Sequence, residues 1–118
     1  MIAVLHRFHG YGSLRGVYQR GQTVRGPMLG LKFSHRDPKR PYRAAVVVSR
    51  KVSKSAVVRN RIRRRLYEII RRQAQATAVP PGTDLVFTVF DEMVGELPAP
   101  KLEKIISDLL AKASQPSL

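Results

Sequence analysis

The stretch RKVSKSAVVRNRIRRRLYEIIRRQ, residues 50–73, carries eight arginines and two lysines against a single acid, Glu68. Apolar residues nevertheless recur in it at helical spacing, and they are Val58, Ile62, Leu66, Ile69 and Ile70. Residues three and four positions apart share one face of an α-helix. The stretch therefore predicts one strongly basic amphipathic helix that is buried on one side and cationic on the others.

The charge of the whole chain is concentrated around this helix. The net charge is +14, to which residues 1–31 contribute +4, residues 32–72 contribute +13 and residues 73–118 contribute −3. A charge this large opposes the compact state by self-repulsion, which a bound polyanion would relieve. Nucleic acid is the partner that we expect first. An anionic membrane surface is the rival, and a merely solvated basic face is the third alternative.

Length and composition limit the protein class. The 118 residues predict a single domain over residues 1–118, with flexible ends at residues 1–12 and 114–118. Cysteine is absent, which excludes disulfides and zinc sites built on thiolates. There is no run of about 18 apolar residues, and the first ten residues do not resemble a signal peptide. We therefore expect a cytoplasmic protein that does not span a membrane.

The first third of the chain predicts a short helix. Ser13 is a suitable N-cap, and Gly21 is well placed to end the helix. Leu14, Val17 and Tyr18 lie between them at the spacing of one helical face. We expect these three side chains to form the inward face, with Tyr18 able to line the edge of a cleft instead.

Two strands are predicted next. Residues 24–33 predict one strand that tolerates Pro27 only at an edge or a bulge, and its alternation places on one face Leu29, Leu31 and Phe33. Residues 44–49 form a continuous apolar run ending in serine. Such a run is typical of a central strand that is covered on both faces.

The second half predicts helix, strand and helix. The basic helix should begin after an N-cap at Ser53 or Ser55 and end near Ala76, before a proline–glycine breaker. The β-branched and aromatic residues of the run LVFTVF, residues 85–90, predict a strand. An acidic loop follows at residues 91–100, and residues 101–113 predict a second amphipathic helix with the apolar face Leu102, Ile105, Ile106, Leu109 and Leu110.

The predicted element order is α, β, β, α, β, α. A small sheet packed on helices is an α+β or α/β sandwich. The link from residues 44–49 through the basic helix to residues 85–90 is long enough for a parallel crossover. The general rule for such crossovers predicts a right-handed one.

The chemistry of the basic helix points to phosphate binding. Arginine dominates over lysine, and its planar guanidinium holds two phosphate oxygens at once. Asn60 lies between two arginines, and its expected use is a specific hydrogen bond, although a plain surface position is the alternative. No Ser-His-Asp order, Walker loop or dinucleotide glycine pattern is present. We therefore predict no catalytic residues, and for His6 and His9 we find no third metal ligand nearby.

A family resemblance follows from these residues. The run VSRKVSKSAVVRNRIRRRLYE, residues 48–68, closely resembles the signature of the bacterial ribonuclease P protein subunit. Its centre is the arginine–asparagine–arginine box at residues 59–61. The runs HRFHGYGSLRGVYQRG, residues 6–21, and TDLVFTVFDEM, residues 83–93, are similar to the first helix and a later strand of that family. The resemblance covers roughly residues 6–110.

The resemblance implies a fold and a function. The family has a compact α/β sandwich of αββαβα order, similar to domain 2 of ribosomal protein S5, with a left-handed βαβ crossover that replaces the right-handed expectation. Its members bind the catalytic RNA of ribonuclease P, an endoribonuclease that removes the 5′ leader of precursor tRNA. The RNA performs the chemistry with bound Mg²⁺, so the protein is an accessory subunit. The implied partners are that RNA and the leader, and neither DNA nor a membrane.

The resemblance also implies two sets of site residues. Contacts to the RNA subunit fall on Arg59, Asn60, Arg61, Arg63, Arg64 and Arg65. Contacts to the single-stranded leader, in a cleft, fall on Leu14, Tyr18, Lys32, Arg50 and Lys51. The alternatives are a structural or ribosomal RNA-binding protein without a processing role and a membrane-surface domain. An aromatic residue beside a cleft favours single-stranded RNA over both alternatives.

Overall fold

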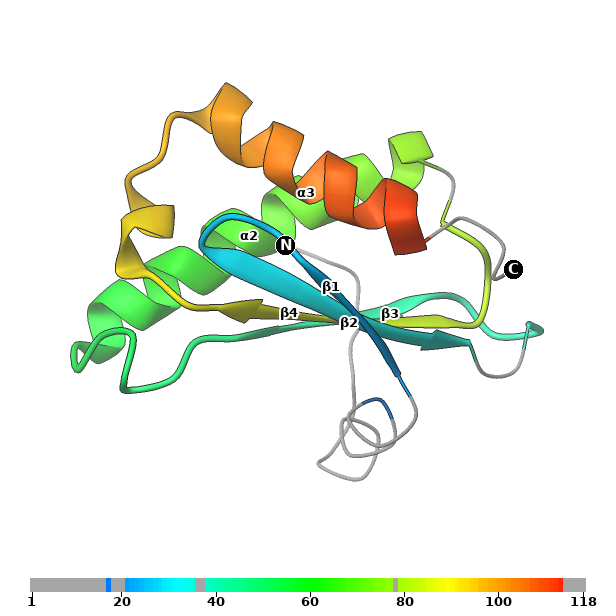
Figure 1. Cartoon of the computed structure of the whole chain (residues 1–118), viewed down its shortest axis with the longest axis horizontal. Helices are drawn as coiled ribbons and strands as arrows, with labels where there is room; N and C mark the ends of the chain where they lie inside the picture. Colours follow the sequence, from blue (N-terminus) through cyan, green and yellow to red (C-terminus); the bar gives the residue numbers. More distant parts are fainter. Residues whose placement is uncertain (1–16, 18–20, 36–37, 78, 114–118) are drawn as a thin grey trace.

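The computed structural model describes residue 17 and residues 21–35, 38–77 and 79–113. Its elements are β1 (Gln22–Arg25), β2 (Leu29–His35), β3 (Arg43–Val47), α2 (Ala56–Thr77), β4 (Thr83–Val89), the 3₁₀ turn η2 (Glu92–Gly95) and α3 (Ala99–Ala113). The four strands form one sheet, and α2 and α3 cover the same face of it (Figure 1). The predicted two-layer α+β sandwich is confirmed for these residues.

The sheet has the order β1-β2-β4-β3. β2 pairs with β1 and β4 in antiparallel fashion, whereas β3 pairs with β4 in parallel. The predicted parallel crossover through the basic helix is therefore present as β3–α2–β4. The two strands that this crossover joins are neighbours in the sheet. The helix α2 packs on the sheet beside them.

The core lies between the sheet and the two helices. Alternate strand residues face the helices and are buried, as the period of two in a strand requires. The sheet contributes Leu29, Leu31, Phe33, Leu85, Phe87 and Val89, and the helices contribute Ile62, Leu66, Ile70, Leu102, Ile106 and Leu110. The apolar stripes predicted for the two helices are confirmed at these positions, which are fully buried, whereas the predicted members Val58 and Ile105 are only partly buried.

The prediction of a single strand over residues 24–33 is wrong. The chain instead forms a hairpin, in which a turn at Gly26, Pro27 and Met28 separates β1 from β2. The Gly26 N–H donates to the Leu29 carbonyl at 3.0 Å, and Met28 adopts a φ of 67°. Proline suits the first central position of a tight turn. A proline inside apolar sequence therefore marked a reversal of the chain rather than a bulge.

The prediction that residues 44–49 form a central strand is also wrong. β3 is the edge strand, and the central positions belong to β2 and β4. Ala44, Ala45 and Val46 are all buried, as predicted, but burial of both faces does not decide which strands lie on either side. The Tyr67 hydroxyl of α2 accepts a hydrogen bond from the Val46 N–H at 3.1 Å, which occupies a backbone donor of this edge strand.

Most predicted boundaries are close to the observed ones. Ser55, and not Ser53, caps α2, because its Oγ accepts from the Val58 N–H at 3.3 Å. β4 begins at Thr83, two residues before the prediction, and α3 begins at Ala99. The predicted acidic loop contains η2, whose N-cap Asp91 accepts from the Met93 N–H at 2.9 Å. The predicted helix after Ser13 and the predicted flexible ends lie outside the described residues, except for Val17.

Candidate nucleic-acid interface

The first half of α2 presents unpaired positive charge. Asn60, Arg61 and Arg64 are exposed, while Ile62 between them is completely buried. Among the described residues, neither Arg61 nor Arg64 makes an ion pair or a side-chain hydrogen bond. The first turn holds no acidic residue. The positive end of the helix dipole therefore adds to the guanidinium charges, which favours a bound anion.

Two arginines of this half shape the surface that their neighbours present. Arg59 Nη1 donates to the carbonyls of Ser53 and Lys54 at 2.9 and 3.1 Å, so it ties the preceding loop to the helix. Arg63 Nη1 donates to the Asn60 side-chain oxygen. Asn60 thus accepts from an arginine one turn later, whereas the expected bond to a backbone group, a phosphate or a metal-bound water stays a prediction.

Arg65 faces a different environment from the other arginines of the box. Its guanidinium donates to the Val94 carbonyl at 3.0 Å and also to the Leu97 carbonyl. These carbonyls belong to η2 and to the short connection between η2 and α3. The predicted RNA contact at Arg65 stays a prediction, but the contacts described here make it a brace between α2 and the η2 segment.

The second half of α2 is largely neutralised. Arg71 pairs with Glu68 at 3.1 Å, and Arg72 pairs with Glu103 of α3 at 3.2 Å. Burial raises the pKa of the nearby Tyr42 hydroxyl, an effect that the Arg71 charge partly offsets. Within α2, the arginines without an acidic partner among the described residues thus lie near its start, next to an exposed turn that carries Arg50, Lys51 and Lys54.

The face of the sheet opposite the helices carries the second group of candidates. Lys32 lies on it with Thr23, Arg25 and Thr88, around a hollow of about 210 Å³. Arg50 and Lys51 follow β3, which β4 separates from β2. The structure therefore places these three cations along one sheet but does not bring Lys32 together with the other two. Leu14 and Tyr18 lie outside the described residues.

Phe90 is a candidate that the sequence did not single out. It is 53% exposed, and the Arg25 guanidinium lies 5.7 Å from the centre of its ring. A Cβ atom at Gly30 would lie only 3.2 Å from that ring, so the glycine lets the ring approach the strand. Strand alternation was the available signal, because Val89 faces the core and Phe90 must face the other way. An exposed ring beside a guanidinium is suited to stacking on a nucleobase.

The described acidic residues do not gather into a metal site. Within the described part of the chain, no three His, Cys, Asp or Glu side chains gather closely enough to hold an ion. The buried Asp84 carboxylate instead accepts from Arg43 Nε and Nη2 at 3.0 and 2.9 Å. Over the same residues, no helix is both long and apolar enough to cross a bilayer.

Comparisons with known proteins agree on one family. The family model for ribonuclease P matches residues 5–114. The ribonuclease P protein component of Synechococcus sp. strain RCC307 is 40% identical over 86 residues, which are 64% of this chain and 68% of that protein. The component from Roseiflexus castenholzii is 35% identical over 100 residues, which are 81% of this chain and 79% of that protein.

Solved structures show the same fold. The RNase P protein of Staphylococcus aureus superposes with a TM-score of 0.75 at 17% identity, covering 93% of this chain and 98% of that one. The protein of Thermotoga maritima gives 0.71 at 22% identity, covering 84% and 89%. Superposition over this length requires the same chain path, including the hand of the β3–α2–β4 crossover. The family model covers residues 5–114 and the fold agrees with it, so the chain belongs to the ribonuclease P protein family.

Proposed function

We propose that this chain is the protein component of a ribonuclease P, and that it assists a catalytic RNA in removing the 5′ leader of precursor tRNA in the cytoplasm. The observation that carries the proposal is the unpaired arginine surface at the start of α2 in a chain of this family. Cleavage of the phosphodiester bond, and the Mg²⁺ that it needs, belong to the RNA in this proposal. The protein is then an accessory subunit of the endoribonuclease.

The start of α2 is the docking surface for the RNA subunit. Arg61 and Arg64 point two uncompensated charges outward, and the helix N-terminus adds its dipole. Arg59 and the Arg63–Asn60 pair hold the loop and the helix surface in one shape. Guanidinium groups neutralise phosphates that otherwise repel one another when the RNA folds. The folded RNA then needs less Mg²⁺.

The open face of the sheet binds the single-stranded leader. Lys32 and Arg25 supply charge for phosphates, and Phe90 supplies a ring on which a base stacks. Stacking is tolerant of sequence because every base has a π face. The leader would reach this face past the turn that carries Arg50 and Lys51. Docking and substrate binding therefore use different elements of the same small domain.

The test is a cleavage assay with the cognate RNA subunit and a 5′-labelled precursor tRNA at a Mg²⁺ concentration that supports little activity of the RNA alone. Adding the protein should restore cleavage at the mature 5′ end. A precursor whose leader is cut to one nucleotide is the matched control, and the protein should stimulate its cleavage less. Tight binding to the RNA without any stimulation would instead favour the second candidate, a structural RNA-binding protein, which the same basic surface also fits.

A further inference from the structure

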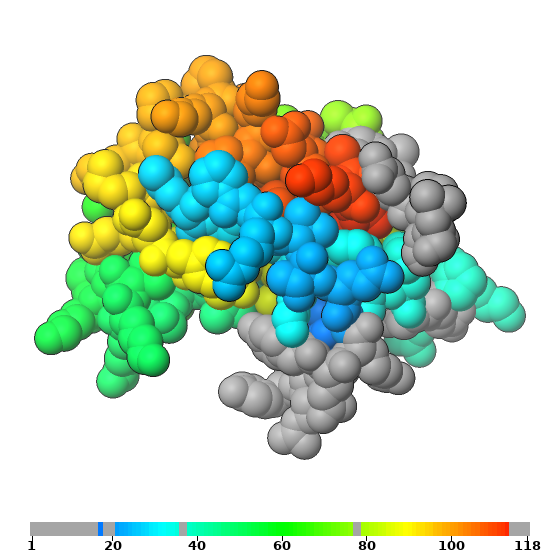
Figure 2. Space-filling model, viewed as in Figure 1, coloured from blue at the N-terminus to red at the C-terminus, as the bar shows by residue number. Residues whose placement is uncertain are grey.

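A second hollow, which shares only Arg25 with the hollow at Lys32, lies between the β1–β2 turn and α3. Figure 2 shows the hairpin resting against α3 on one side of the molecule. The hollow has a volume of about 400 Å³ and an apolar floor, formed by Pro27, Met28, Leu97, Ile105 and Leu109. Pro27 is exposed, and Met28 and Ile105 are only partly buried. We call this hollow the α3 groove.

Met28 holds an unusual conformation at the base of the groove. Its φ of 67° lies in the left-handed region, which glycine and asparagine occupy easily and other residues only at a cost in free energy. Strained backbone of this kind often accompanies a binding function. The Met28 side chain packs against the edge of the core, where its flexible thioether can adapt to an incoming apolar group.

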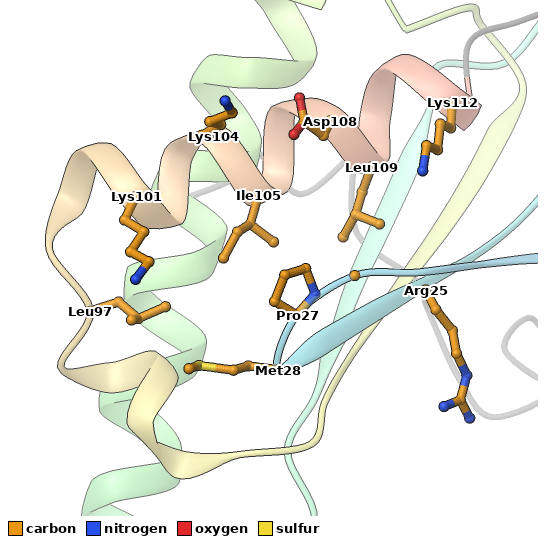
Figure 3. Close-up of a pocket in the computed structure, with 11 residues that line it drawn as sticks. Arg25, Pro27, Met28, Leu97, Lys101, Lys104, Ile105, Asp108, Leu109 and Lys112 are labelled. Atoms are coloured by element: carbon orange, nitrogen blue, oxygen red, sulfur yellow. The ribbon is translucent and has the colours of Figure 1, made fainter.

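Two lysines stand at opposite ends of the groove. Figure 3 shows the ammonium groups of Lys101 and Lys112 directed toward its mouth. Lys104 and Asp108 also line the groove, but their charged ends point away from it. The two end lysines are about three helical turns, or roughly 16 Å, apart along α3. Among the described residues, neither has an ion pair. The groove therefore combines an apolar floor with an unneutralised cation at each end.

We propose that the α3 groove binds an acidic amphipathic segment of a partner protein, with large apolar side chains on the floor and carboxylates at Lys101 and Lys112. RNA fits the groove poorly, because none of the described residues that line it is aromatic, and the Arg25 guanidinium on its rim points away from it toward Phe90. Residues of α3 line the groove, and no described residue of α2 does. The inference goes beyond the proposed function and does not depend on it.

The probe is a fluorescein-labelled helical peptide with leucines on one face and two glutamates about three turns apart. Its matched control has glutamine at both glutamate positions. Fluorescence anisotropy should detect binding of the first peptide to the full chain, with a Kd at least about fivefold lower than that of the control. Equal affinity for both peptides, or no binding of either, would overturn the proposal.

Variants of α3 separate the groove from the general positive charge of the protein. Lys101→Glu and Lys112→Glu should each weaken peptide binding about fivefold, in line with reversing an exposed ion pair. Lys104→Glu makes the same change of net charge on the same helix, but its side chain points away, and it should change the affinity less than twofold. A uniform loss in all three variants would mean that only net charge attracts the peptide.

Met28→Gly supplies the remaining readout. Glycine relieves the left-handed strain, so the melting temperature should rise, while removal of the side chain should weaken the peptide several-fold. Unchanged affinity would limit Met28 to a structural role and contradict the proposal. Displacement of the peptide by a single-stranded RNA oligonucleotide would identify nucleic acid as the occupant instead. Self-association that the peptide abolishes, measured by sedimentation, would identify a second copy of the chain.

Discussion

The two halves of α2 carry the same kind of residue in different surroundings. In the first half, Arg61 and Arg64 are exposed and have no acidic partner among the described residues. In the second half, Arg71 and Arg72 pair with Glu68 and with Glu103 of α3. The charge density of the sequence is therefore a poor guide to the charge available for RNA. Among the described residues of α2, exposed arginines without an acidic partner lie only in the first half.

The largest expected effect is on the free energy of unfolding, and it comes from the buried apolar stripe that runs along both halves of α2. Leu66→Ala should lower the free energy of unfolding by about 2–5 kcal/mol, because Leu66 is completely buried between the helix and the sheet. Urea denaturation measures this loss. Val57→Ala is the control on the same helix, since Val57 is 76% exposed, and it should cost less than about 0.5 kcal/mol. Similar losses in the two variants would contradict the described burial.

The next prediction compares the contributions of the two halves of α2 to RNA affinity. Arg61→Ala with Arg64→Ala should weaken binding to the RNA subunit about 100-fold and reduce the slope of log affinity against log salt by about 1.5, since two phosphate contacts are lost. Filter binding over a range of salt concentrations measures both quantities. Arg71→Ala with Arg72→Ala removes the same charge from the other half and should cost less than about fivefold. Equal losses would show that total charge, rather than its placement, decides RNA binding.

Arg65 tests the boundary between the halves. Arg65→Ala should lower the free energy of unfolding by about 2 kcal/mol, because the carbonyls of Val94 and Leu97 lose a charged donor. The salt slope for RNA binding should stay nearly unchanged. Chemical denaturation and filter binding on the same preparation give the two values. If the variant is as stable as the unmodified protein but shows a reduced salt slope, Arg65 contacts RNA, as the family resemblance implies.

The smallest effect is expected at the neutralised end. Arg72→Ala should lower the free energy of unfolding by less than about 0.5 kcal/mol, because its ion pair with Glu103 is solvent-exposed. The difference should shrink further as salt is added, since exposed charges are screened. Thermal unfolding at low and high ionic strength checks this. A larger loss that salt does not reduce would mean that Arg72 contributes through packing of its aliphatic stem.

Much of the site was predictable because it depends on local pattern. The buried stripe Ile62, Leu66 and Ile70 follows from helical spacing, and the exposure of Arg61 and Arg64 follows from the same geometry. The roles of Arg59 and Arg65 were not predictable. Their hydrogen-bond acceptors are backbone carbonyls of other segments, and no side-chain pattern announces a carbonyl. Phe90 was not predicted as a site residue, because its exposed ring becomes a candidate binding group only through its position beside Arg25 of another strand.

Two errors in the fold have the same origin. The apolar pattern on both sides of Pro27 was correct, but it continued across a chain reversal that only the turn geometry at Met28 reveals. The run at residues 44–49 is buried as predicted, yet it occupies an edge because strand order is a property of the whole sheet. Patterns of burial depend on each strand alone, whereas neighbours in a sheet depend on how the connections are routed.

Short-range sequence therefore determined the basic amphipathic helix, the buried faces and the arginine–asparagine–arginine box at residues 59–61, but it left the cap open between Ser53 and Ser55. Tertiary structure decided the partners of Arg72 and Arg65, since the acid that pairs with Arg72 and the carbonyls that hold Arg65 come from distant segments, whereas Glu68 pairs with Arg71 within the same helix. It also decided that the β1–β2 turn meets α3 and leaves the groove with a lysine at each end. The physical reason is that side-chain spacing is set by local geometry, whereas charge compensation requires contacts that only folding brings together.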